Sequence, residues 1–308
     1  MNKILKIGTR ESELAVWQAT LVKDLLKKFD VNSELIFIKS EGDIDLKTPL
    51  YEMGVQGIFT KTLDAALLNK RIDIAVHSMK DVPTQLADGI AQAAVLKRGN
   101  YRDILVVNGQ HSTVNDILNS PLTIATSSIR RKAQWLHRYP NHTMENLRGN
   151  VNTRLKKLEE SNWHGAIFAA AGLERINLRP KNSIDLDWML PAPAQGAIMI
   201  VCREEDNDAQ EKCLLLNDEA TALCTKIERD FLRTLLGGCS TPISALAEIE
   251  DDELFFIGNI LSPDGKQKKE VEKILPVEMA TNIGREAANE LLENGAKEIA
   301  DSIRNAAK

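Results

Sequence analysis

RIDIAVHSMKDVPT, residues 71–84, is the stretch around which the rest of the chain is organised. The alternation of apolar residues from Ile72 to Val76 predicts a short strand. Lys80 and Asp81 follow its end, and Pro83 prevents the strand from simply continuing. Ligands of open α/β sheets bind at the carboxyl ends of the strands, so this charged tip is a candidate for chemistry. A surface ion pair that merely closes a strand is the alternative.

The segments before this strand alternate between strand and helix. Strand patterns at 3–8 and 34–39 are each followed by a helical pattern, the second of them at 59–69. The turn after the first strand places Arg10 and backbone N–H groups at a helix N-terminus, which favours anions. This alternation predicts an α/β domain with a mostly parallel sheet.

The middle of the chain repeats this plan. Residues 121–136 form a strand pattern, then Ser128 and an arginine pair that enters a helix, and residues 163–172 echo the strand at 71–76. We interpret this as two similar α/β halves that face each other, although coincidence between common strand–helix turns is the alternative. Two connections, at 97–101 and 190–196, would join the halves and leave a cleft between them.

The pattern changes after Cys213. A helical pattern at 219–236 ends at two glycines, three strand patterns follow without helices between them, and a closing helix is expected at 277–294. These features predict a small antiparallel α+β domain. The three strands are expected at 243–249, 253–261 and 268–274. The predicted domains are residues 1–97 with 197–215, residues 101–191, and residues 219–308.

Composition and length restrict the class of protein. A chain of 308 residues suits two or three domains, and 43% hydrophobic with 27% charged residues excludes disordered and fibrous classes. We find no apolar run of membrane-spanning length and no apolar signal core at the N-terminus, so we expect a cytoplasmic protein. The cysteines are ten or more residues apart, which matches no metal-ligand pair and no secreted disulfide framework.

Positive charge is concentrated in residues 121–181. Eleven Lys or Arg oppose four Glu there, which gives this segment a charge of +7. Because the net charge of the chain is −5, the other residues together carry a charge of −12. A basic segment in an acidic protein indicates a specific anionic ligand. Nucleic-acid binding is disfavoured because only 5% of the residues are aromatic.

Several arginines lie at turns and element ends instead of along a helix face. Arg148 and Arg154 flank a predicted turn, and together with Arg130, Arg131 and Arg175 they suit bidentate capture of several carboxylates. A solvated helix face is the alternative. The pattern favours contact with a ligand that carries more than one carboxylate.

Cys239 differs from the other three cysteines in its setting. Two glycines precede it and Ser-Thr-Pro follows, so its thiol is expected on a tight loop past a helix end. A thiol in such a loop can act as a nucleophile or an attachment point. A buried loop cysteine is the alternative, and we expect the other three to be small buried hydrophobic residues.

Seven motifs, in this order along nearly the whole chain, resemble the porphobilinogen deaminase (hydroxymethylbilane synthase) family. They are GTRES with LAVWQA (8–19), HSMKDVP (77–83), TSSIRR (126–131), LRGNVNTRL (147–155), AAGLER (170–175), PAPAQGA (191–197) and GGCSTP (237–242). The resemblance implies two domains like type II periplasmic binding proteins and a third domain that carries a cofactor. It also implies head-to-tail joining of four deaminated porphobilinogen molecules into hydroxymethylbilane, released by hydrolysis, by a cytoplasmic monomer that needs no metal, nucleic acid or membrane.

The resemblance assigns roles position by position. Cys239 would hold a dipyrromethane cofactor through a thioether bond, and Asp81 would be the catalytic carboxylate. Further cofactor contacts are implied for Lys80, Ser128, Arg130, Arg131 and Arg154, and substrate contacts for Arg10, Ser12, Arg148, Arg175, Phe59 and Gln195. Glu52 and Gln56 depart from the family's lysine-rich cleft loop, and Ala194 replaces a usual glycine, so we expect an active enzyme with an altered lid.

Two other functional classes compete with this interpretation. A two-lobed anion-binding protein without chemistry is disfavoured by the third domain with Cys239. A cysteine hydrolase that uses Cys239 with one of the five histidines lacks a recognisable pairing.

Overall fold

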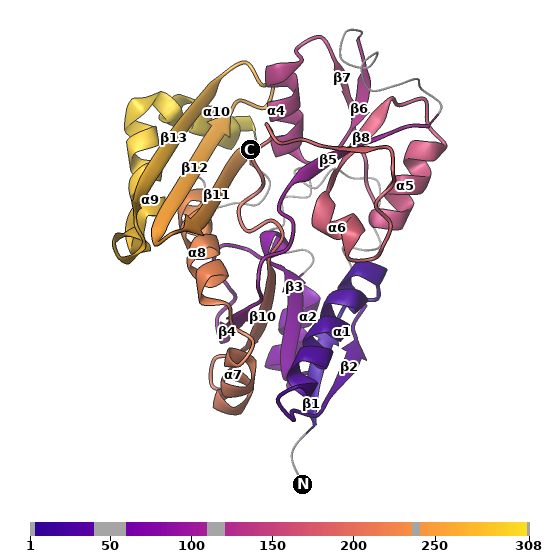
Figure 1. The fold of residues 1–308 in the computed structure, drawn as a ribbon, viewed down its shortest axis with the longest axis vertical. Helices are drawn as coiled ribbons and strands as arrows, with labels where there is room; N and C mark the ends of the chain where they lie inside the picture. The colour runs from indigo at the N-terminus through magenta and orange to yellow at the C-terminus, as the bar shows by residue number, and fades with distance from the viewer. Residues whose placement is uncertain (1–3, 40–59, 110–120, 236–240, 307–308) are drawn as a thin grey trace.

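A computed structural model describes residues 4–39, 60–109, 121–235 and 241–306 of the chain (Figure 1). Three β-sheets organise these residues. In Figure 1 the first sheet lies at the bottom, the second at the upper right and the third at the upper left. Among the described helices, none combines the length and the apolar character that crossing a membrane requires.

The first sheet has five strands in the order β2-β1-β3-β10-β4. Four of them point the same way, and β10 runs antiparallel between β3 and β4. Pairing with β10 continues to the end of β3, where Ile198 lies opposite Ser78, so β3 extends two residues past the predicted strand end at Val76. The strands are β1 Leu5–Thr9, β2 Ser33–Phe37, β3 Ile74–Ser78, β4 Ile90–Val95 and β10 Ile198–Arg203.

The second sheet repeats the plan of the first, with the order β7-β6-β8-β5-β9. The strand β5 is the reversed one in this sheet. It lies between β8 and the edge strand β9 and runs antiparallel to both. This shared strand order confirms the prediction of two similar α/β halves. The strands are β5 Asp103–Val107, β6 Thr123–Ala125, β7 Thr143–Glu145, β8 Gly165–Ala169 and β9 Ser183–Asp185.

Helices cover both sheets, and we call each sheet with its helices a lobe. The first lobe carries α1 Glu13–Lys27, α2 Lys61–Leu68 and α7 Asn207–Leu214; the second carries α4 Ile129–Arg138, α5 Val151–Glu159 and α6 Ala170–Glu174. Apolar clusters lie on both faces of each sheet, as expected for sheets with buried strands. The residues that follow β1 and β3 lie at the edge of the first sheet that faces the second lobe.

The C-terminal unit begins with α8 Glu219–Leu235, which packs on an antiparallel sheet. The sheet has the order β11-β12-β13, with strands Ile243–Glu250, Glu253–Leu261 and Lys268–Pro276, as the sequence predicted. The closing helix predicted at 277–294 is confirmed in part, by α9 Ile283–Leu291. Its predicted start is instead the 3₁₀ helix η3 Val277–Asn282. After α9 the chain continues through η4 Leu292–Ala296, where Gly295 has φ of 93° and interrupts the helical backbone, into the further helix α10 Lys297–Ala306.

The two predicted connections between the lobes lie side by side. The N–H of Gly99 donates to the carbonyl of Gly196 at 3.0 Å, and Arg98 Nε donates to the carbonyl of Gln195 at 2.8 Å. Gly196 has φ of 88°, and a Cβ there would lie 2.7 Å from the Gly99 carbonyl oxygen. The close approach of the two chains therefore requires glycine at 196.

Candidate active site

A cleft lies between the two lobes, with an empty volume of ≈ 1170 Å³ that includes open solvent at its mouth. The first lobe supplies residues that follow β1 and β3, and the second supplies Arg131 on α4, the start of α5 and residues of α6. The predicted site residues that line it are Arg10, Ser12, Lys80, Asp81, Arg131, Arg148 and Arg154. Segments far apart in sequence thus bring most of the predicted set into one cavity.

The lining of this cleft is strongly cationic. Four arginines and Lys80 face two carboxylates, those of Glu13 and Asp81. Glu13 already accepts a hydrogen bond from Asn152 Nδ2 at 2.8 Å, across the mouth between the lobes. The remaining excess of positive charge in a half-enclosed space favours a ligand with several carboxylates.

Asp81 lies on the turn η2, Met79–Asp81, that follows β3 directly. Its carboxylate is exposed to the cleft, and no hydrogen bond or close ion pair joins it to another described residue. Lys80, its neighbour, points toward the second connection and donates from Nζ to Gln195 Oε1 at 3.0 Å. Burial, followed by the charge of Arg131, lowers the pKa of Lys80 to about 8.

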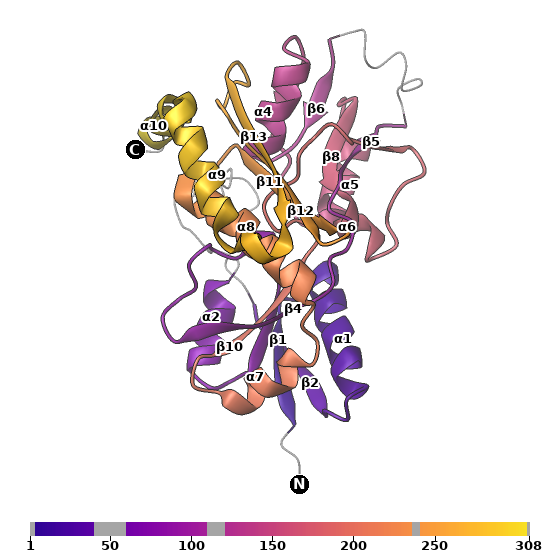
Figure 2. The ribbon, with the colours of Figure 1, turned by 60° about the vertical axis from the view of Figure 1, so that its left-hand side comes forward.

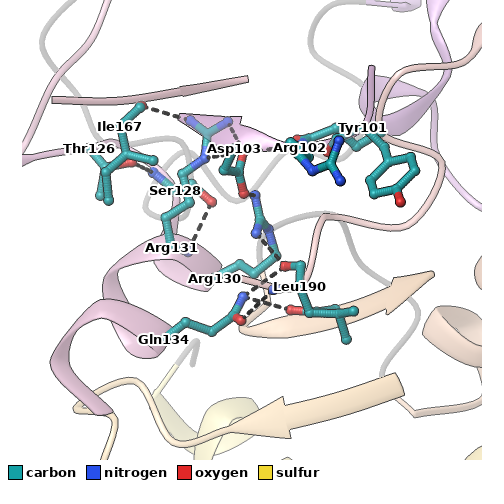
Figure 3. A network of polar contacts seen from close by, with 12 residues as sticks. Tyr101, Arg102, Asp103, Thr126, Ser128, Arg130, Arg131, Gln134, Ile167 and Leu190 are labelled. Carbon is teal, nitrogen blue, oxygen red and sulfur yellow. Dashed lines mark hydrogen bonds and ion pairs between the residues drawn. The ribbon is translucent and has the colours of Figure 1, made fainter. Parts of the chain in front are cut away.

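A buried carboxylate that the sequence did not predict lies behind the cleft, at the first residue of β5. Asp103 is fully buried and accepts hydrogen bonds from Arg131 Nη2, as Figure 3 shows, and from Gln195 Nε2, both at 2.8 Å. Arg130 Nη2 lies 2.7 Å from its other oxygen. Burial alone would raise the pKa of Asp103, but the two arginines lower it to about 2, so the group stays ionised.

Ser128, Arg130 and Gln195 are not among the residues that line the cleft. Ser128 caps α4, where its hydroxyl accepts from the Arg131 N–H, and Arg130 Nη1 donates to the carbonyl of Leu190 at 2.7 Å. Gln195 links Lys80 in the first lobe to Asp103 in the second. The structure therefore places these three residues where they support the cleft wall.

The turn before α5 and the first turn of that helix present Arg148 and Arg154 to the cleft. Gly149 adopts φ of 117°, and Asn150 caps the helix by accepting from the Thr153 N–H at 2.9 Å. Arg154 Nε donates to the carbonyl of Gly149 at 2.7 Å, which fixes the direction of its guanidinium. Burial, followed by the charge of Arg131, lowers the pKa of Arg154 to about 10, against the opposing effect of Asp81. Arg154 is thus a desolvated cation close to Asp81.

Arg175, at the end of α6, also lies outside the cleft lining. Its Nη2 donates to the carbonyl of Gly196 at 2.7 Å, and its guanidinium lies over the ring of Trp17, 5.8 Å from the centroid. Burial lowers its pKa to about 10, opposed by Glu174. Arg175 thus joins both lobes and a connection, and its predicted substrate contact stays a prediction.

Four residues of the sequence prediction lie outside the described residues: Phe59, Cys239, Glu52 and Gln56. The other cysteines, Cys202, Cys213 and Cys224, are buried, as the sequence predicted. Burial raises their pKa values to about 11, 12 and 12 respectively, so all three thiols stay protonated.

Comparison with known proteins gives a consistent result across the chain. Residues 5–211 match the family model described as "Porphobilinogen deaminase, dipyromethane cofactor binding domain", and residues 222–293 match "Porphobilinogen deaminase, C-terminal domain". Proteins named porphobilinogen deaminase from Chloroherpeton thalassium and Chlorobium phaeobacteroides are 40% and 41% identical, each over 99% of both chains. Among solved structures, the Bordetella pertussis BvgS VFT2 domain aligns with 69% of this chain and 86% of its own, at a TM-score of 0.43 and 11% identity.

Proposed function

The chain belongs to the porphobilinogen deaminase family, and from this premise we propose that it is a hydroxymethylbilane synthase of tetrapyrrole biosynthesis. It would deaminate four porphobilinogen molecules, join them head to tail on a dipyrromethane held by Cys239, and release the linear tetrapyrrole by hydrolysis. The observation that carries the proposal is the exposed carboxylate of Asp81, which accepts no hydrogen bond from the described residues, in a cleft lined by an excess of cations.

The cationic lining suits the cofactor and the substrate because every pyrrole ring carries two carboxylates. We assign cofactor contacts to Lys80, Arg131 and Arg154, and substrate contacts to Arg10, Ser12 and Arg148. Ser12 caps α1 without a hydrogen bond from its side chain, so its hydroxyl can donate to an anion at the helix N-terminus. The family resemblance also assigns cofactor contacts to Ser128 and Arg130 and substrate contacts to Arg175 and Gln195, although these four residues lie outside the cleft lining. Phe59 remains a proposed contact by family resemblance alone.

The proposed chemistry requires a carboxylate at the reacting carbon. When the C–N bond of the aminomethyl group breaks and the nitrogen leaves as ammonia, the ring and the methylene carbon that remains on it become an azafulvene cation, and Asp81 would stabilise this charge through the pyrrole N–H. Joining a pyrrole α-carbon to the methylene carbon releases a proton, which Asp81 would accept. The dipyrromethane, when bound, supplies the free pyrrole position at which the first unit is joined. The neighbouring cations keep the carboxylates of the substrate in place during these steps.

Three finer statements belong to the same proposal. We assign one domain to residues 1–97 with 197–215, one to 101–191 and one to 219–308, since each holds one of the sheets. The enzyme would act as a monomer, because each chain supplies both walls of its cleft. It would act in the cytoplasm, as the resemblance to the family implies.

Intact mass and turnover test the proposal together. Purified wild-type protein should exceed its sequence mass by one bound dipyrromethane and should release one ammonia for each porphobilinogen consumed. Cys239→Ala should lack the mass excess, while Cys224→Ala, a buried thiol on α8, should keep it. An unmodified wild-type chain that binds porphobilinogen without consuming it would instead support the anion-binding alternative.

Asp81→Asn tests the catalytic assignment separately. The amide removes the negative charge but keeps the shape, so we expect kcat to fall about 10²-fold or more while circular dichroism and cofactor mass stay unchanged. Full turnover in this variant would remove the carboxylate from the mechanism.

A further inference from the structure

The turn that carries Asp81 is held by a side chain from the C-terminal unit. Arg229, on α8, donates from Nη1 to the carbonyls of Val82 at 2.9 Å and Met79 at 3.3 Å, and from Nη2 to the carbonyl of Pro83 at 2.6 Å. In Figure 2, α8 lies where the third sheet meets the first lobe. One guanidinium thus binds three backbone oxygens that flank the proposed catalytic residue.

These contacts matter because the Asp81 side chain has no other support. Its carboxylate forms no hydrogen bond with a described residue, so the backbone of η2 determines where the carboxylate lies in the cleft. This turn has only three residues, and Arg229 binds the carbonyl of its first residue together with those of the two residues that follow it. A planar cation with five N–H donors is well suited to bind several such oxygens at once.

The position of Arg229 on α8 adds a second consequence. The helix ends at Leu235, four residues before Cys239 in the sequence, so the same helix leads to the proposed attachment point of the cofactor. We propose that Arg229 is a positioning residue, which holds the Asp81 turn in register with the cofactor-bearing unit. This inference rests on the proposed function, because it concerns the placement of Asp81 for that reaction.

The proposal predicts a selective loss of turnover. In the holoenzyme, Arg229→Met should lower kcat on the order of tens-fold, since a displacement of about 1 Å can cost about 10²-fold in rate. KM should change less than about 3-fold because the cleft cations remain in place. Arg229→Lys, which keeps the charge but not the forked geometry, should recover part of kcat.

A matched control lies one turn further along the same helix. Arg233 is half exposed and pairs with Asp230, so Arg233→Gln removes an arginine of α8 without touching η2. We expect this variant to keep wild-type kcat. Intact mass and circular dichroism should show bound cofactor and a native fold for all three variants. If Arg229→Met does not fold, Arg229→Lys provides the same comparison.

A double-mutant comparison separates positioning from a general structural role. Because Arg229 acts through Asp81, adding Arg229→Met to Asp81→Asn should lower the single-turnover rate, measured with enzyme in excess, by less than about 3-fold further. Equal loss in both backgrounds, or wild-type kcat in Arg229→Met, would overturn the inference. Failure of wild-type protein to consume porphobilinogen would instead overturn the proposed function, so the two failures are distinguishable.

Discussion

Lys80 and Asp81 are neighbours in the chain, yet different forces act on their side chains. Asp81 is exposed to the cleft, while Lys80 turns toward the connection and donates to Gln195. Burial and the charges of Arg131 and Arg130 disfavour the ammonium of Lys80, and the charges of Asp81 and Asp103 favour it. The first group of effects is larger, so the pKa of Lys80 falls to about 8 from 10.5.

The lowered pKa predicts an unusually reactive amine. In the cofactor-free variant Cys239→Ser, acetylation of Lys80 by acetic anhydride should reach half its maximal rate near pH 8, since the neutral amine is the nucleophile. Because the folded state loses this proton before the unfolded state does, this group's contribution to the free energy of unfolding rises from about pH 8 to 10.5. Peptide mass mapping across pH 6–11 measures the labelling profile.

Two comparisons control this labelling experiment. Lys266, whose side chain is 83% exposed, serves as the reference amine in the same sample. Asp81→Asn should move the Lys80 profile to still lower pH, because it removes a charge that favours the ammonium. If Lys80 and Lys266 are labelled with the same pH dependence, the burial argument is wrong.

At the residue scale, the sequence predicted the cations that line the cleft better than the buried residues that hold those cations in place. Motifs identified Arg131, Arg148 and Arg154, because turns and helix starts favour exposure to a ligand. They did not identify Asp103, which opens an apolar strand, nor the inward direction of Arg130. A charged residue directly before the apolar run ILVV is a usable signal of a buried carboxylate. Its partners, however, come from α4 and residue 195, and sequence patterns do not specify such distant contacts.

The two connections between the lobes are the elements in which backbone geometry is most restricted. Ala194 and Gly196 both have positive φ, 62° and 88°, but their surroundings differ. Ala194 is fully buried and donates its N–H to Glu228 Oε2 at 2.6 Å, whereas Gly196 faces the backbone of Gly99. The same type of substitution should therefore have different effects at the two positions.

Gly196→Ala should destabilise the fold by about 2 kcal/mol or more. A left-handed alanine costs about 1–2 kcal/mol, and its Cβ would lie 2.7 Å from the Gly99 carbonyl oxygen, which cannot move as a side chain can. The gain from a less flexible unfolded chain, about 0.4–1 kcal/mol, does not offset these costs. Urea denaturation followed by circular dichroism measures the difference.

Ala194→Gly is the matched control for this prediction. Relief of the left-handed strain, about 1–2 kcal/mol, is opposed by the loss of a buried methyl, about 0.8 kcal/mol, and by the entropy of unfolded glycine. We expect a change within about 1 kcal/mol. Equal effects of Gly196→Ala and Ala194→Gly would show that the approach to Gly99 does not limit the connection.

At the element scale, apolar periodicity predicted the helices and strands whose signals are local in the sequence. It failed for strands whose formation depends on pairing with residues far away in the sequence. The helix at 219–236 and the three strands that follow it were predicted within two residues of their observed ends. No strand was predicted at 198–203 or 90–95, because β10 pairs with β3 and β4, and both lie more than a hundred residues from β10 in sequence. The closing helix was predicted to end at Asn294, next to the break at Gly295, but the further helix α10 after the break was not predicted.

Across the whole molecule, α8 joins the C-terminal unit to both connections. Glu228, fully buried, accepts from Arg98 Nη1 at 2.6 Å and from the N–H groups of Ala194 and Ala247 at 2.6 and 2.8 Å. One carboxylate therefore binds the first connection, the second connection and strand β11. With Arg229 on the same helix, α8 couples the lobes, the proposed catalytic turn and the third sheet.

The Arg98–Glu228 ion pair provides the final prediction. Arg98→Met leaves a buried carboxylate without its cation and should lower the free energy of unfolding by about 3–5 kcal/mol. Adding Glu228→Gln removes the charge but keeps an oxygen for the backbone N–H groups, so the double variant should be more stable than the sum of the single losses predicts. Lys156→Met, at an exposed ion pair with Glu160, should cost at most about 1 kcal/mol in the same urea denaturation assay. Strict additivity of the two single losses would mean that the buried pair does not act as a unit, and α8 would then be connected to the lobes mainly through apolar packing.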